Sequence, residues 1–260
     1  MTLDTAVIPC GGLGRRLRPI TNWVPKEMLP VGLKPLLYWA LDEAAGAGLL
    51  RVVMVVNPHK PIVEAAARQY QGPLDLEFVP QPAFRGLGDA LRAAREQLAG
   101  APFVLLQPDQ LFDGPNVTAA LLAGHRASRL PTVLLGEVRQ QDAVHVGAFG
   151  RAEVEAAPDG TTRVTRLEAR GSSQARFDTG GAATALAPVG RVVYPGDVFE
   201  LLDEEAAVLP RGAELDDRGA LQRLAAAHRL AAVITAARCY DIGVPEGYQD
   251  AVSRWPARVS

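Results

Sequence analysis

The 260-residue chain has little cysteine, no surplus of positive charge and no long apolar run. Its two cysteines, Cys10 and Cys239, cannot form a disulfide framework and are typical of a protein in a reducing cytoplasm. Lysine and arginine number 27 against 29 acidic residues, which argues against a surface that binds nucleic acid non-specifically. No stretch approaches the roughly 18 apolar residues of a membrane span, and the segment around Asp4 and Pro9 lacks the features of a signal peptide. We therefore expect a cytoplasmic protein that binds neither nucleic acid nor membranes.

The composition, with 48% hydrophobic and 22% charged residues, is that of an ordinary globular protein. In the first half, short apolar runs alternate with segments of helical periodicity, a pattern that favours βαβ units and a largely parallel sheet. The apolar runs predict strands at 5–10, 51–56, 74–79 and 102–107. The intervening segments predict helices at 35–47, 60–70 and 88–99, and a further helix follows at 115–128.

The second half has a different pattern. A β-hairpin is expected within 144–170, because Asp159 and Gly160 form a strong turn signal between extended segments. Further strands are expected at 131–138, 182–193 and 231–236, with helices at 195–206, 216–228 and 245–254. No Gly/Ser linker or repeat separates the halves, so the pattern predicts one continuous body.

A glycine-rich loop directly follows the first expected strand. Glycines allow positive φ and let backbone N–H groups approach an anion closely, and arginines supply forked donors for phosphate oxygens. The loop lacks the third glycine of a dinucleotide fingerprint, since Leu17 stands there, and it lacks the Gly-Lys-Ser/Thr end of a Walker loop. A tight turn with surface arginines remains the alternative to an anion site. The candidate nucleotide-binding residues of this loop are Gly11, Gly12, Leu13, Gly14, Arg15 and Arg16.

A second motif follows, Pro-Lys-Glu-Met-Leu-Pro at residues 25–30. With this motif at this distance from the glycine loop, the chain resembles the sugar-1-phosphate nucleotidyltransferases, and most of all their bacterial uridylyltransferase branch. The resemblance is dense over residues 6–44 and weakens after about residue 150. Its further segments are Gln81, 86–90, 108–109, 190–191 and 240–243.

The resemblance implies one α/β domain over residues 1–260, with a Rossmann-like, three-layer fold, a mixed but mainly parallel central sheet and a small β-hairpin region. Residues 1–130 would bind the nucleotide, and residues 131–260 the sugar. The implied reaction transfers a nucleotidyl group from a nucleoside triphosphate, UTP in this branch, to a sugar 1-phosphate such as glucose 1-phosphate, and releases pyrophosphate. The alternatives are dTTP, another sugar 1-phosphate, or a nucleotide-binding relative without catalysis. Related enzymes commonly associate, so a homo-oligomer is implied by analogy.

The same resemblance implies roles for individual residues. Arg16 would hold the triphosphate and the leaving pyrophosphate, and Lys26 would contact the α-phosphate. Asp109 and Asp241 would bind Mg²⁺, a cation that prefers oxygen ligands. Gln81 would hydrogen-bond the edge of the uracil, with Gly86 beneath the base.

The chain departs from the family pattern mainly in its second half. The family lysine that contacts the sugar phosphate is Ala169 here, while the neighbouring sugar-contacting glutamate is present as Glu168. Arg170 is the expected substitute for the lysine, because residues two apart on a strand share a face. Gly147 matches a glycine beside the sugar. In the glycine loop, Arg15 replaces a small hydroxyl residue and supplies an additional charge.

Overall fold

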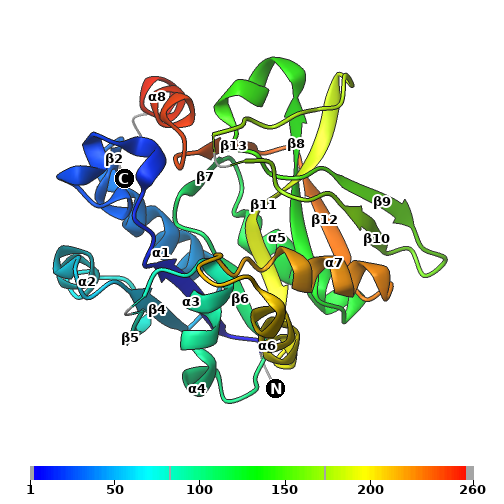
Figure 1. Cartoon of the computed structure of the whole chain (residues 1–260), viewed down its shortest axis with the longest axis horizontal. Helices are drawn as coiled ribbons and strands as arrows, with labels where there is room; N and C mark the ends of the chain where they lie inside the picture. The colour runs from blue at the N-terminus through cyan, green and yellow to red at the C-terminus, as the bar shows by residue number, and fades with distance from the viewer. Residues whose placement is uncertain (1–2, 82, 173, 256–260) are drawn as a thin grey trace.

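A single mixed sheet runs through the computed structural model, which describes residues 3–81, 83–172 and 174–255 (Figure 1). Among these residues the sheet has nine strands in the order β5-β4-β1-β6-β11-β8-β12-β10-β9. Strands from both halves of the sequence therefore belong to one sheet, as the α/β prediction requires. Across the described ranges, no helix combines the length and the apolar character needed to cross a bilayer.

The first half forms the parallel part of the sheet. Strands β4 and β6 flank β1, β5 lies outside β4, and all these pairs are parallel. Alternate residues of each strand face opposite sides, so Val7 packs into one core and Ile8 into the other. Strands β1, β4 and β6 are almost entirely apolar because both of their faces are covered, whereas the edge strand β5 carries Asp75 and Glu77. Their bounds are β1 Thr5–Cys10, β4 Arg51–Val56, β5 Asp75–Pro80 and β6 Phe103–Leu106.

The second half adds mostly antiparallel pairs to the same sheet. Strand β11 is antiparallel to both β6 and β8, whereas β12 is parallel to β8. The predicted hairpin is present as β9 and β10, which pair in antiparallel fashion on either side of the turn at 157–160. The bounds are β8 Thr132–Arg139, β9 Ala152–Ala156, β10 Thr162–Leu167, β11 Thr184–Tyr194 and β12 Ala231–Thr235.

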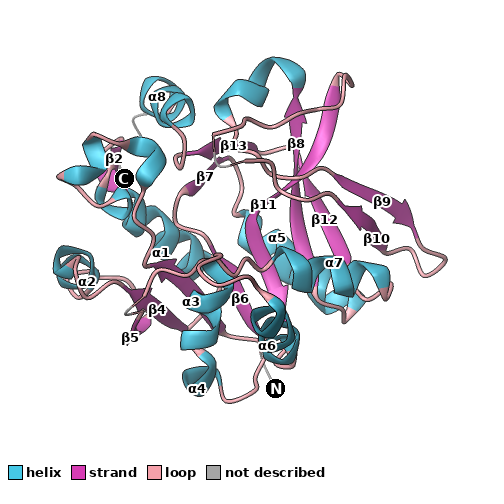
Figure 2. Cartoon of the chain, in the orientation of Figure 1, coloured by secondary structure: helices cyan, strands magenta, loops and turns pink. Residues whose placement is uncertain are grey.

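Helices cover both faces of the sheet, which confirms the three-layer prediction (Figure 2). One face packs against α1 Leu36–Gly46, α2 Pro61–Ala67 and α5 Val117–Ser128. The other face packs against α3 Leu87–Ala93, α4 Arg95–Leu98, α6 Val198–Val208 and α7 Arg218–Ala226. The last helix, α8 Pro245–Arg254, contributes Ala251 to a smaller core beside the loop that follows β1.

Three details differ from the sequence prediction. The helix expected at 88–99 is divided into α3 and α4 at Ala94, whose ψ of 0° interrupts regular α geometry. The hairpin begins later than expected, since residues Gln140–His145 form a 3-10 helix. Two short antiparallel pairs were not predicted because their strands are too short to show periodicity. They are β2 Pro30–Val31 with β3 Lys34–Pro35, and β7 Gln110–Asp113 with β13 Arg238–Asp241.

Candidate active site

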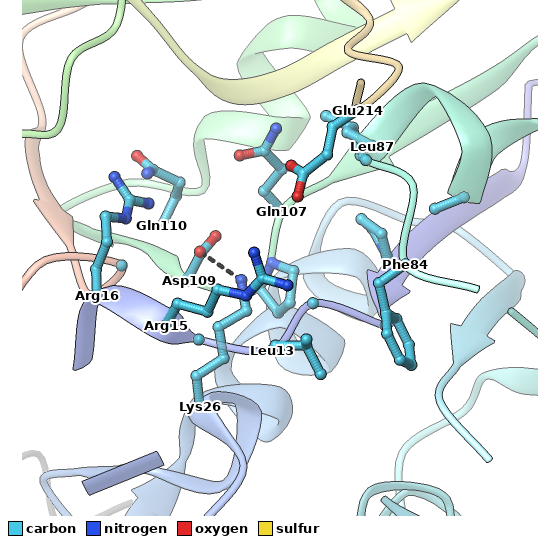
Figure 3. A pocket seen from close by; sticks show the side chains of 18 of the residues that line it. Leu13, Arg15, Arg16, Lys26, Phe84, Leu87, Gln107, Asp109, Gln110 and Glu214 are labelled. Carbon is cyan, nitrogen blue, oxygen red and sulfur yellow. Dashed lines mark hydrogen bonds and ion pairs between the residues drawn. The ribbon is translucent and has the colours of Figure 1, made fainter. Parts of the chain in front are cut away.

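A cavity of about 720 Å³ opens where the parallel strands end (Figure 3). The glycine loop follows β1, Gln81 follows β5, and Asp109 lies shortly after β6. Carboxyl ends of parallel strands meet at one edge of a sheet, which is where ligands bind in such folds. The side chains and loop segments lining the cavity include residues 11–16, Lys26, Gln81, Phe84, Gly86, Leu87, Ala90, 107–110, Phe149, Arg170, Gln174, Glu214 and Gly243.

The glycine loop is held in place from outside the cavity. The side-chain amide of Asn57 donates to the carbonyl of Gly11 at 3.3 Å, and the Lys60 ammonium donates to the carbonyl of Gly12. Gly14 has a φ of 61°, the left-handed region that glycine occupies without strain. The predicted loop residues all line the cavity, and the last two of them, Arg15 and Arg16, belong to the short 3-10 helix Arg15–Leu17.

Lys26 and Asp109 meet on the floor of the cavity. The Lys26 ammonium donates to Oδ2 of Asp109 at 2.7 Å, and the two side chains are only 17% and 11% exposed. Burial alone would raise the pKa of Asp109, but the adjacent Lys26 charge lowers it below its ordinary value. Burial likewise opposes the charge on Lys26, and Asp109 raises the pKa of that lysine. Both groups are therefore ionised, and Arg15 reaches the same part of the cavity (Figure 3).

The short β7–β13 pair brings Asp241 to the same place. It sets Asp241 opposite Gln110, and the N–H of Ile242 donates to the carbonyl of Asp109 at 2.8 Å. The Asp241 carboxylate is buried and accepts from the N–H groups of Gly147 and Gly243, at 2.8 and 2.9 Å. Burial, and then the charge of Asp109, raises the pKa of Asp241. Asp241 itself is 1% exposed and is not among the described residues that line the cavity, whereas Gly243 is.

Gly243 lets the two carboxylates and Arg16 approach the backbone closely. A Cβ at this position would lie 2.9 Å from Oδ1 of Asp241 and 3.1 Å from Oδ2 of Asp109. It would also lie 2.8 Å from a guanidinium nitrogen of Arg16. Two acidic oxygens and one cationic fork thus come together around this glycine, and carboxylate oxygens are the ligands that a divalent cation prefers.

Arg191 supports the turn that carries Asp109, a role that the sequence did not reveal. It is fully buried and pairs with both oxygens of Glu43 at 2.8 and 2.7 Å. Its remaining N–H groups donate to the carbonyls of Gln107 and Gln110, at 2.8 and 2.9 Å. These carbonyls flank Asp109, so the buried ion pair fixes the turn on both sides.

On one side of the cavity, the start of α3 packs against the loop before α7. Gly86 has a φ of 101°, and a Cβ there would lie 2.2 Å from the carbonyl oxygen of Leu215. The N–H of Gly88 donates to that same carbonyl at 2.8 Å, and the N–H of Leu215 donates to the carbonyl of Arg85 at 2.6 Å. The loop before α7 is therefore fastened to the loop before α3, and only glycine fits at position 86.

Next to the loop before α7, Arg170 lines the cavity but Glu168 does not, as the lining of the described residues shows. Strand β10 ends at Leu167, so the expected alternation of a continuing strand does not apply to these two residues. Glu168 turns to Arg151 and accepts two hydrogen bonds from it, at 2.9 and 2.7 Å. Arg170 instead donates to Asp216 at 2.8 Å and lies over the ring of Phe149. The prediction that the two side chains share a strand face was wrong.

Several lining residues were not singled out from the sequence. Gln107 and Gln110 line the cavity on either side of Asp109. Their nearness in sequence to this predicted metal ligand was the only signal that could have indicated them. Glu214 points into the cavity from the loop before α7 (Figure 3). That loop lies in the segment where the family resemblance was poor. The remaining unpredicted lining residues include Phe84, Phe149 and Gln174.

Comparisons with known proteins agree with the fold. The family described as "Nucleotidyl transferase" matches residues 5–256 of the chain. UTP–glucose-1-phosphate uridylyltransferase 1 of Staphylococcus saprophyticus is 25% identical over 270 residues, covering 95% of this chain and 91% of that protein. The structure of apo UDP-glucose pyrophosphorylase has a TM-score of 0.80 and 25% identity, with 97% of both chains covered. A UDP-glucose pyrophosphorylase complexed with UDP-glucose shares the fold, with a TM-score of 0.78, 24% identity, and coverage of 97% of this chain and 98% of that one.

Proposed function

This chain belongs to the nucleotidyl transferase family, and we propose that it transfers a uridylyl group from UTP to glucose 1-phosphate, releasing pyrophosphate and forming UDP-glucose. The observation that carries the proposal is the convergence of Arg15, Arg16 and Lys26 with Asp109 at the ends of the parallel strands. The names of the relatives favour UTP and glucose 1-phosphate over the alternatives of dTTP, another sugar or a non-catalytic role. We assign the nucleotide to residues 1–130, the sugar to residues 131–260, and the reaction to the cytoplasm.

The proposed reaction needs charge neutralisation more than proton transfer. A phosphate oxygen of the sugar phosphate is already an anion; it forms a bond to the α-phosphorus of UTP while the bond from that phosphorus to the pyrophosphate oxygen breaks. Fixed cations that offset the developing charge lower the barrier, because they need little reorganisation in the transition state. Lys26 would contact the α-phosphate, and Arg15 and Arg16 would hold the departing pyrophosphate.

The two carboxylates would hold a divalent cation, for which we propose Mg²⁺. Asp109 and Asp241 each bring a carboxylate oxygen close to Gly243, and the hard Mg²⁺ ion takes oxygen ligands. Such an ion supplies charge neutralisation and alignment of phosphate oxygens. The ion pair between Lys26 and Asp109 keeps this carboxylate ionised at neutral pH, ready to ligate.

The acceptor would enter on the side of Arg170. This arginine offers a forked donor to the sugar phosphate in place of the family lysine, which is Ala169 here. Glu214 faces the cavity from the next loop and offers carboxylate oxygens to sugar hydroxyl groups. Glu168 and Gly147 were also expected near the sugar; Glu168 would reach it only by leaving Arg151, and Gly147 already donates to Asp241.

The test is product formation with a matrix of substrates. Purified protein with Mg²⁺ is incubated with UTP or dTTP and a panel of sugar 1-phosphates, and the nucleotide sugars are separated by anion-exchange chromatography. We expect UDP-glucose as the main product, with the highest kcat/KM for UTP and glucose 1-phosphate. The absence of any nucleotide sugar from every combination would overturn the proposal, and a different preferred pair would correct its substrates.

A further inference from the structure

The side chain of Gln81 is held in one orientation at the wall of the cavity. Gln81 is buried, with 3% of its surface exposed, and its backbone N–H donates to the carbonyl of Val56 at 2.8 Å. Its side-chain Nε2 donates to Oδ2 of Asp89 at 3.1 Å and more weakly to the carbonyl of Gly86 at 3.4 Å. A carboxylate and a carbonyl only accept hydrogen bonds, so the NH₂ group of the amide must be the part that faces them.

The carbonyl oxygen of the same amide then faces the opposite way. A Cβ on Gly11 would lie 2.1 Å from Oε1 of Gln81, which places this oxygen directly over Gly11. Both residues line the cavity. Because Gly11 has no side chain, Gln81 presents a fixed hydrogen-bond acceptor to whatever binds there.

A fixed acceptor discriminates between pyrimidine bases. Uracil carries a donor N–H at ring position 3, whereas cytosine has a lone pair on that nitrogen. An acceptor opposite this position forms a hydrogen bond with uracil and faces a second acceptor in cytosine. A site built around such a bond rejects the wrong partner because a buried polar group is left unpaired.

We propose that Asp89 is the specificity-determining positioning residue of the base site, which it makes selective for pyrimidines with an N3–H by fixing the orientation of the Gln81 amide. The inference rests on the proposed function and goes beyond it, because Asp89 contacts Gln81 and not the substrate. An ionised carboxylate cannot donate, so it accepts the amide NH₂ group and excludes the flipped orientation. An asparagine at position 89 can donate as well as accept a hydrogen bond, so it would accommodate both orientations of the Gln81 amide.

The position of Asp89 is itself well fixed. It lies in the first turn of α3, between the buried residues Gly88 and Ala90. The N–H of Gly88 is bonded to the carbonyl of Leu215, which anchors the start of the helix to the loop before α7. The backbone at Asp89 is therefore held in place, and its carboxylate stays beside Gln81.

The experiment compares the equilibrium binding of UTP and CTP by calorimetry, using the full chain with Mg²⁺ and no sugar phosphate. The variants are Asp89→Asn and Asp89→Ala, with Arg92→Ala as the matched control on the outer side of the same helix, where Arg92 pairs with Asp203. We expect the wild type to prefer UTP, and both Asp89 variants to lower the UTP:CTP affinity ratio about tenfold. The control should leave the ratio unchanged, and thermal unfolding of each variant checks that it is folded.

The outcomes separate the inference from the function on which it rests. If the wild type prefers UTP and both Asp89 variants retain that preference, the inference is overturned while the proposed function stands. An equal loss of affinity for UTP and CTP would also overturn it, since a merely structural role weakens both nucleotides alike. If the wild type binds neither nucleotide, the proposed function fails and the inference fails with it.

Discussion

The two sides of the cavity are built in different ways. On the side that we propose for the nucleotide, the glycine loop, Gln81 and Asp109 follow parallel strands of one sheet, and backbone hydrogen bonds fix their positions. On the side that we propose for the sugar phosphate, the acceptor side, Arg170 and Glu214 lie on loops outside regular strands, and an ion pair to Asp216 holds Arg170. Strand ends impose a geometry that tolerates few changes, whereas loops joined by side-chain pairs allow residues to be exchanged. The difference parallels the family resemblance of the sequence, which is dense over residues 6–44 and weakens after about residue 150.

The largest effect is expected from removing the ammonium group of Lys26, which pairs with Asp109 in the cavity. Lys26→Ala should lower kcat by about 10³-fold, because it removes a fixed charge at the proposed site of nucleotidyl transfer and leaves Asp109 without its ion-pair partner. Steady-state kinetics with UTP and glucose 1-phosphate measure this effect. Lys34→Ala is the matched control, since Lys34 pairs with Asp42 outside the cavity. Near-normal turnover of the Lys26 variant would refute its role.

Removing the cation of the acceptor side should produce a different kinetic signature. Arg170→Ala should raise the KM for glucose 1-phosphate about 10- to 100-fold, the usual cost of losing a hydrogen bond to a charged group. The KM for UTP should change little. Arg166→Ala, which removes an exposed pair with Glu153, is the control. A larger effect on UTP than on the sugar phosphate would contradict the assignment of the two sides.

The stability of the protein should depend on pH through Asp217, the residue after the ion-pair partner of Arg170. Burial, and then the charge of Asp216, raises the pKa of Asp217 to about 7. The native protein thus retains a proton that the unfolded chain loses near the ordinary value of 3.8, and this contribution to stability declines as the pH rises. Relative to Asp217→Asn, the wild type should lose up to about 1.4 kcal/mol of unfolding free energy per pH unit between about pH 4 and pH 7.

Urea denaturation of both proteins across this range measures the difference. The asparagine oxygen can still accept the hydrogen bond from Tyr194, which lies 2.7 Å from the carboxylate in the wild type. The variant should therefore be the more stable protein at the upper end of the range. Parallel stability curves for the two proteins would show that Asp217 does not titrate as described.

The smallest effect is expected at Glu168. Its pair with Arg151 is partly exposed, with side-chain exposures of 26% and 33%, and such pairs contribute about 0.2–1 kcal/mol to stability. Glu168→Gln should leave the KM for glucose 1-phosphate within about threefold of the wild type, since the side chain lies outside the cavity lining. An increase as large as that of the Arg170 variant would show that Glu168 leaves Arg151 to bind the sugar.

Most of the fold was predictable because its signals are local. The apolar runs of β1 and β4 and the Asp-Gly turn of the β9–β10 hairpin are visible in short windows of sequence. The meeting of the glycine loop with Asp109 also follows from local features, since both come after parallel strands. The fold class is confirmed by the sheet order and by the similarity to solved structures.

The remaining features depend on contacts between distant segments. The end of β10 at Leu167 separates Glu168 from Arg170, and only the tertiary partners Arg151 and Asp216 determine where each side chain goes. Arg191 supports the Asp109 turn through a buried pair with Glu43, which no periodicity reveals. Sequence patterns locate strand ends well, but they do not choose among partners for a charged side chain on a loop.

The most direct test of the account measures pyrophosphate release under initial-rate conditions, with UTP and glucose 1-phosphate varied independently. The rate of pyrophosphate release should saturate with both substrates, require a divalent cation and fall to zero without the sugar phosphate. Arg170→Ala should change only the dependence of this rate on the glucose 1-phosphate concentration. Release without the acceptor, or no release with both substrates present, would contradict the account.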